Sequence, residues 1–230
     1  MDFDYIEKNL YTLISDIERS ADLAGVKVPK LVAVTKSGSD EELLALIRAG
    51  AYAIGENRPG ELARRGGLIK EAGLSVELHQ IGTLQSNKAK LVAADATLIH
   101  SLDSHSLAKE LDKQGKKLGI KIPALIEINS AKEPQKSGVL PEDAEEFLAS
   151  VSTYESIKVT GLMTMGPVSD DPENLRPYFK LTKELFDKLN SRYGFGDTPT
   201  LSMGMSNSYR VAIEEGSTLI RVGRRLFIKE

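Results

Sequence analysis

The sequence has no cysteine and no tryptophan among its 230 residues. The lack of cysteine excludes disulfide scaffolds, thiol nucleophiles and thiolate metal sites, and it is typical of a cytoplasmic protein. The three histidines, His79, His100 and His105, do not have the spacing of a compact metal site. We therefore expect a cytoplasmic protein that holds no metal.

Targeting signals and long apolar runs are also missing. The acidic start of the chain lacks the basic and apolar parts of a signal peptide. No apolar run approaches the roughly 20 residues that a membrane span needs. A formal net charge of −3 argues against nucleic-acid binding through bulk electrostatics, and basic pairs such as Arg64-Arg65 indicate solvated surface. We expect neither a membrane nor a nucleic acid among the partners.

Several familiar catalytic motifs are absent. The glycine-rich dinucleotide fingerprint and the P-loop spacing do not occur. The turn from Gly204 to Ser208 half-matches a nucleophile elbow, but serine replaces the final glycine and no histidine follows it. Serine-hydrolase chemistry is therefore excluded.

What the sequence does contain is a regular alternation of short apolar runs and helical patterns. The predicted strands cover residues 31–35, 51–54, 76–81, 96–101, 122–129, 158–163, 200–203 and 218–222. The predicted helices cover residues 4–24, 40–48, 60–71, 86–93, 103–118, 141–150, 172–193 and 208–215. No change in composition marks a linker.

Eight such units predict a single α/β domain over residues 1–230, a (β/α)8 TIM barrel. An open, doubly wound sheet is the alternative. Only a short tail follows the last predicted strand, so the extra N-terminal helix at residues 4–24 would complete the ring.

Lys36 directly follows the first predicted strand, Leu31 to Thr35. Parallel strands present their carboxyl ends to the functional face of an α/β protein. A lysine that leaves an apolar strand at this face suits a Schiff base. The alternative is a lysine that merely extends from a buried strand into water.

Polar residues or glycines stand at nearly every predicted strand end. They are Lys36, Asn57, Gly82, Ser101, Asn129, Met163, Ser206 and Gly223. The turns at residues 202–207 and 222–224 predict an anion site, because barrels often bind phosphate after strands seven and eight and at helix N-termini. A simple helix cap is the alternative for such a turn.

Seven segments, in this order, resemble the pyridoxal-phosphate homeostasis protein family, and the resemblance covers nearly the whole chain. They are Ala33-Val34-Thr35-Lys36, Gly55-Glu56-Asn57, the run from His79 to Lys88, Lys136-Ser137-Gly138, Gly161-Leu162-Met163, the run from Leu201 to Ser206, and Arg221-Val222-Gly223. That family is similar to the barrel domain of alanine racemase, the third fold type of proteins that use pyridoxal 5'-phosphate (PLP).

The resemblance implies that PLP is the cofactor. Lys36 would hold its aldehyde as an internal aldimine, and Arg221 would face the pyridine nitrogen. The full implied set is Lys36, Asn57, Ile81, Ser101, Met203, Ser206, Arg221, Gly223 and Arg224. In that set Asn57 lies beside the ring, and Ile81 or Met203 packs near its faces. The phosphate would be held by Ser206, Gly223 and the residue after it. A permanently charged guanidinium would keep the ring nitrogen unprotonated and weaken the ring as an electron sink.

The sequence departs from the family pattern at a few positions. Arg224 stands where threonine or serine is common, so it would contact the phosphate through its backbone or add its charge. Asn207-Ser208, Ile228 and Ile54 also depart from the pattern. None of these changes affects Lys36.

The resemblance is compatible with two functions, and the residues without the resemblance allow a third. The first is a PLP carrier or homeostasis protein without robust catalysis, a monomer or weak dimer whose partners include PLP-dependent apoenzymes. The second is a small amino-acid racemase or lyase. A racemase needs a base on each face of its substrate. In alanine racemase the second base is a tyrosine from an additional β-domain, and this chain stops at Glu230. The third is a barrel that binds another phosphorylated metabolite, with no role for Lys36. We favour the carrier.

Overall fold

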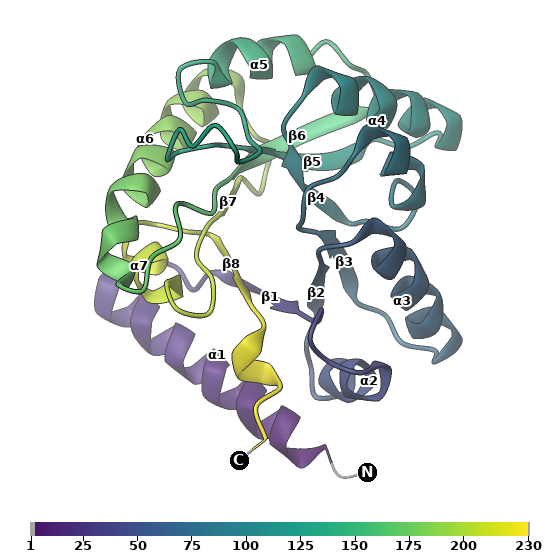
Figure 1. Cartoon of the computed structure of the whole chain (residues 1–230), viewed down its shortest axis with the longest axis vertical. Helices are drawn as coiled ribbons and strands as arrows, with labels where there is room; N and C mark the ends of the chain where they lie inside the picture. The colour runs from purple at the N-terminus through teal and green to yellow at the C-terminus, as the bar shows by residue number, and fades with distance from the viewer. Residues whose placement is uncertain (1–2, 230) are drawn as a thin grey trace.

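Eight parallel strands form a closed barrel in sequence order, with β8 pairing back to β1 (Figure 1). The computed structural model describes residues 3–229. The strands are β1 (Lys30–Val34), β2 (Ala53–Glu56), β3 (Glu77–Gln80), β4 (Leu98–Leu102), β5 (Ile122–Glu127), β6 (Ile157–Met163), β7 (Thr200–Ser202) and β8 (Leu219–Val222). The predicted TIM barrel is confirmed, and the open sheet is ruled out.

Helices surround the barrel on the outside (Figure 1). The α-helices are α1 (Asp4–Ala24), α2 (Asp40–Arg48), α3 (Pro59–Glu71), α4 (His105–Leu118), α5 (Ala144–Val151), α6 (Arg176–Tyr193) and α7 (Tyr209–Glu214). The 3-10 helices are η1 (Ser86–Leu91), η2 (Pro172–Leu175) and η3 (Arg224–Leu226). No helix among residues 3–229 is long and apolar enough to cross a membrane.

Two predicted helices differ in the structure. The segment predicted as a helix at 86–93 is the 3-10 helix η1 over Ser86–Leu91. The helix predicted at 172–193 divides into η2 and α6. Pro177 lies in the first turn of α6, where its missing N–H would have no partner in the helix.

The N-terminal helix completes the ring, as predicted. Its buried residues Ile6, Leu10, Leu13 and Ile17 recur every three or four positions and form one apolar stripe. α1 packs against α2, α7 and η3, so it covers the gap beside β8 where no full helix follows (Figure 1).

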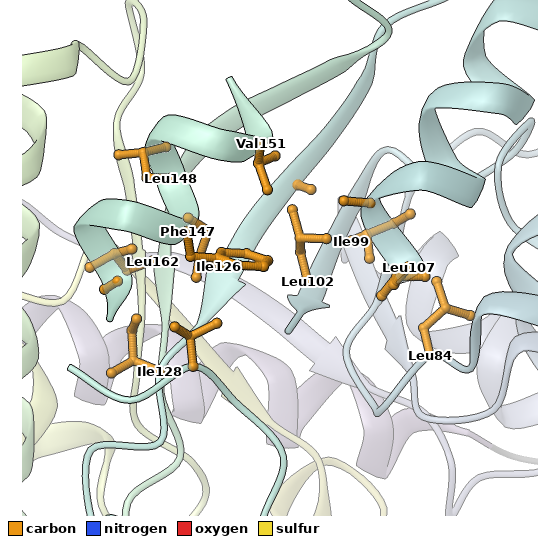
Figure 2. Close-up of a cluster of buried hydrophobic side chains, with 14 of the residues drawn as sticks. Leu84, Ile99, Leu102, Leu107, Ile126, Ile128, Phe147, Leu148, Val151 and Leu162 are labelled. Atoms are coloured by element: carbon orange, nitrogen blue, oxygen red, sulfur yellow. The ribbon is translucent and has the colours of Figure 1, made fainter. Parts of the chain in front are cut away.

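The apolar core has an inner and an outer part. Seven residues from six of the strands, together with Ile81 just after β3, touch one another inside the barrel: Val32, Val34, Ala53, Ile81, Leu98, Leu125, Met163 and Leu219. The largest outer cluster lies between strands and helices, and Figure 2 shows Ile126 of β5 against Phe147 and Val151 of α5. Successive strand residues point to opposite faces. Val32 and Val34 point inward, and Lys36 follows two residues later in the turn at the carboxyl end of β1.

Candidate functional site

Lys36 lies just beyond the end of β1 with an exposed side chain. It lines an open cleft of about 510 Å³ together with Ser37, Glu56, Asn57, Arg58, Glu61 and Arg65. Asn57 is exposed at the end of β2, the strand next to β1. Its carbonyl oxygen accepts a 3.1 Å hydrogen bond from the amide of Gln80 on β3. The structure therefore brings Lys36 and Asn57 together at the barrel mouth.

A buried ion pair holds the loop that carries Lys36. The guanidinium of Arg65 donates to the carbonyl oxygens of Thr35 and Gly38, each at 2.7 Å. It therefore fixes the backbone on both sides of Lys36. Glu56 pairs with Arg65 and accepts a hydrogen bond from the hydroxyl of Thr35. The prediction that Arg64-Arg65 is solvated surface is wrong for Arg65, whose side chain is only 7% exposed. The structural role of Glu56 was not predicted either.

The ends of β7 and β8 form a second group of polar atoms beside β1. A Cβ atom on Gly223 would lie 2.7 Å from the carbonyl oxygen of Val34, so only glycine allows β8 to approach β1 this closely. The Gly223 amide faces the hydroxyl of Ser206 at 3.4 Å. Arg224 is exposed and begins η3. Ser206, Gly223 and Arg224 are therefore neighbours.

The free backbone amides of this group lie around the start of α7. The sequence predicts free amides at the N-terminus of this helix. The amides of Ser208 and Tyr209 are not free, because both donate to the carbonyl oxygen of Met205. By contrast, the amides of Ser206 and Asn207 have no acceptor anywhere in residues 3–229. The amides of Arg210 and Val211, in the first turn of α7, likewise have no acceptor among these residues. Donors available to an anion therefore lie both in the turn before the helix and in its first turn.

Arg221 and Glu127 bring two ionisable groups into the barrel interior. Arg221 is 3% exposed and donates to the Ser202 hydroxyl and, at 3.1 Å, to the Thr164 carbonyl oxygen. Burial lowers the pKa of Arg221 to about 10, which leaves it charged at neutral pH. Glu127 is buried at the end of β5, and its Oε2 atom has no hydrogen-bond partner among the described residues. Burial raises the pKa of Glu127 to about 7.

The other predicted site residues are buried in the walls. Ile81 belongs to the inner apolar cluster. The hydroxyl of Ser101 donates to the carbonyl oxygen of Gly82 at 2.7 Å. Met203 belongs to the outer cluster, on the helix side of the sheet. Within the described residues, no group of three or more histidine or acidic side chains could hold a metal ion.

A family model described as "Alanine racemase, N-terminal domain" matches residues 9–229. The pyridoxal phosphate homeostasis protein of Aquifex aeolicus is 38% identical over 222 residues, which cover 96% of each chain. That of Helicobacter pylori is 37% identical and covers 97% of this chain and 98% of its own. The chain belongs to the pyridoxal phosphate homeostasis protein family.

A solved structure gives the same relationship. PipY of Synechococcus elongatus, solved with PLP bound, superimposes with a TM-score of 0.83 at 28% identity. The match covers 97% of this chain and 100% of PipY. The fold of PipY thus matches nearly all of this chain.

Proposed function

We propose that this chain binds PLP at the barrel mouth, with Lys36 holding its aldehyde, and acts in intracellular PLP and amino-acid homeostasis without robust catalysis. The observation that carries the proposal is that Gly223, the neighbour of Ser206, lies against Val34, two residues before Lys36, where β8 pairs with β1. PipY, which has PLP bound, shares this fold over the whole chain. When bound, PLP supplies an aldehyde that a primary amine captures and a ring that withdraws electrons.

The donor set of the site fits PLP. Lys36 offers an exposed primary amine. The unpartnered amides of Ser206 and Asn207 and the charge of Arg224 suit a phosphate. Arg221 offers a guanidinium that can only donate, which suits the ring nitrogen.

The remaining predicted residues would have smaller roles. We assign Asn57 to the side of the ring and Ile81 to its apolar floor, since both lie at the mouth end of their strands. The hydroxyl of Ser101 already donates to the carbonyl oxygen of Gly82, and Met203 packs outside the barrel. We therefore assign Ser101 and Met203 to support of the barrel wall.

The side chains around Lys36 favour a carrier over a racemase. A racemase needs an acid or base on each face of the substrate. Of the described residues that line the Lys36 cleft, none is a tyrosine or histidine. The carboxylates of Glu56 and Glu61 are already paired, with Arg65 and Arg64. The cleft is also open, which suits exchange of PLP better than protected proton transfer.

Reductive trapping tests the proposal. Purified protein is mixed with PLP, its visible absorbance is recorded, the adduct is reduced with borohydride, and the modified peptide is mapped. We expect a single adduct on Lys36, its loss in Lys36→Ala, and its retention in Lys180→Ala, which removes an exposed lysine of α6. No adduct, or one spread over surface lysines, would reject the site. Turnover of added amino acids by the loaded protein would favour the racemase instead.

A further inference from the structure

The barrel interior contains a continuous chain of hydrogen-bonded side chains that the proposed function does not use. Nε2 of His79 lies 3.1 Å from Oε2 of Glu77 on the same strand, β3. Nδ1 of His79 lies 2.9 Å from Nε2 of His100 on β4. Nδ1 of His100 lies 3.0 Å from the hydroxyl of Ser202 on β7. His79, His100 and Ser202 are each at most 1% exposed.

The two ends of this chain lie at opposite ends of the barrel. Glu77 begins β3, and its carboxylate forms an ion pair with Lys30, which begins β1; the two side chains are 38% and 35% exposed. At the other end, Ser202 accepts a hydrogen bond from Arg221, which we assign to the ring nitrogen of PLP. The chain therefore connects the face of the barrel remote from Lys36 to the cofactor site.

The carboxylate of Glu77 fixes the direction of the hydrogen bonds along this chain. Hydrogen bonds from His79 and Lys30 lower the pKa of Glu77 to about 2 despite its partial burial, so the carboxylate only accepts. Nε2 of His79 must then carry a hydrogen. Arg221 only donates, so the Ser202 oxygen accepts from it. Because this oxygen has a second lone pair, the direction of its bond to His100 is set from the Glu77 end.

The position of the hydrogen on each imidazole ring follows from the Glu77 end. Burial lowers the pKa of His79, against the opposing effect of Glu77, and lowers that of His100 still further, so both rings are neutral and carry one hydrogen each. Because the hydrogen of His79 is on Nε2, its Nδ1 atom accepts. His100 must therefore donate from Nε2, and its Nδ1 atom accepts from the hydroxyl of Ser202. Every hydrogen between Ser202 and Glu77 points toward Glu77, and no polar atom in this path is left unpaired.

We propose that Glu77, His79, His100 and Ser202 form a positioning relay that holds the guanidinium of Arg221 toward the ring nitrogen and sets its electrostatic environment from the opposite face of the barrel. The proposal rests on the assignment of Arg221 in the proposed function. The charged groups around the relay are Lys30 at the Glu77 end and Glu127, with Asp103 beyond it, at the Arg221 end.

The first test needs no cofactor. The nitrogen chemical shifts of the histidine rings are measured by NMR in the ligand-free protein at neutral pH, with His79→Gln and His100→Gln used to assign the signals. We expect His79 and His100 to be neutral with the hydrogen on Nε2 in both. A ring with the hydrogen on Nδ1, or a charged ring, would overturn the relay whether or not PLP binds.

The second test uses the PLP-loaded protein. Glu77→Gln keeps an oxygen acceptor at the partly exposed end but removes its charge. We expect the absorbance of the Lys36 adduct to titrate at a pH shifted by about one unit, the size expected for one charge acting through the protein interior. Glu71→Gln, which removes an exposed charge at the end of α3, should leave the titration unchanged.

Ser202 provides the link to Arg221 and a check by rescue. Ser202→Ala should weaken PLP binding by roughly tenfold, because a hydrogen bond to a charged group is lost. Ser202→Thr keeps the hydroxyl and should restore most of the affinity. If the adduct forms on Lys36 but Glu77→Gln and Ser202→Ala both behave as wild type, the relay is wrong and the proposed function stands. If no adduct forms in the wild type, the proposed function fails and the NMR result alone decides the relay.

Discussion

Glu127 shows how a single buried residue links the site to stability. Burial raises the pKa of its carboxyl from 4.5 to about 7, with the negative Asp103 adding to the effect and Arg221 opposing it. The folded protein therefore binds this proton more tightly than the unfolded chain does. The stabilisation is complete below the unfolded pKa and is lost as the pH rises to the folded pKa.

Replacing Glu127 with glutamine should remove this pH dependence. Relative to Glu127→Gln, the wild type should lose about 3 kcal/mol of unfolding free energy between pH 4.5 and pH 7, and little more above that. Urea unfolding of both proteins across this range measures the difference. Glu184→Gln, at an exposed position of α6, is the matched control and should follow the wild type at every pH. A constant difference between wild type and Glu127→Gln would contradict the burial argument.

At the scale of elements, the Lys36 loop depends on a guanidinium that bridges two carbonyl oxygens and a carboxylate. Arg65→Lys should therefore cost about 2 kcal/mol or more and slow trapping of PLP on Lys36, because an ammonium cannot span this set of acceptors and leaves Glu56 poorly paired. Arg64→Lys changes the neighbouring arginine, whose side chain is 47% exposed, and should stay within about 0.5 kcal/mol of wild type. Thermal unfolding and borohydride trapping compare the two variants. Equal behaviour would show that Arg65 does not hold the loop.

The elements were predictable where local pattern decides them. Apolar runs located all eight strands. The turns after strands seven and eight singled out Ser206 and Gly223, which the structure places 3.4 Å apart. Arg65 was missed because its sequence context is that of a surface helix, and only the folded chain places it against Glu56. The hydrogen bonds of His79 and His100 could not be predicted for the same reason. The two residues are 21 positions apart and meet only when β3 and β4 pair.

Across the whole molecule, Asp16 on α1 joins the first helix to the last elements of the chain. Its carboxylate accepts hydrogen bonds from Tyr209 and Arg210 at the start of α7 and lies 3.5 Å from Arg225 of η3. Burial alone would raise the pKa of Asp16, but these hydrogen bonds and one from Arg19 outweigh it and hold the pKa well below its usual range. The contribution of the charged form is therefore present above the unfolded pKa and is lost as the pH falls toward the folded one.

Asp16→Asn should lower the unfolding free energy by about 1–3 kcal/mol at pH 7, because it leaves the arginines of α7 and η3 without their counter-charge. Urea unfolding should show the difference from wild type shrinking as the pH falls below about 4, where the unfolded chain takes up the proton. Asp22→Asn, at an exposed position on the same helix, should have little effect. Because η3 begins with Arg224, which we assign to the phosphate, Asp16→Asn should make η3 less firmly held and so weaken PLP binding as well. A stability loss with unchanged PLP affinity would show that α1 closes the ring of helices without supporting the phosphate end of the site.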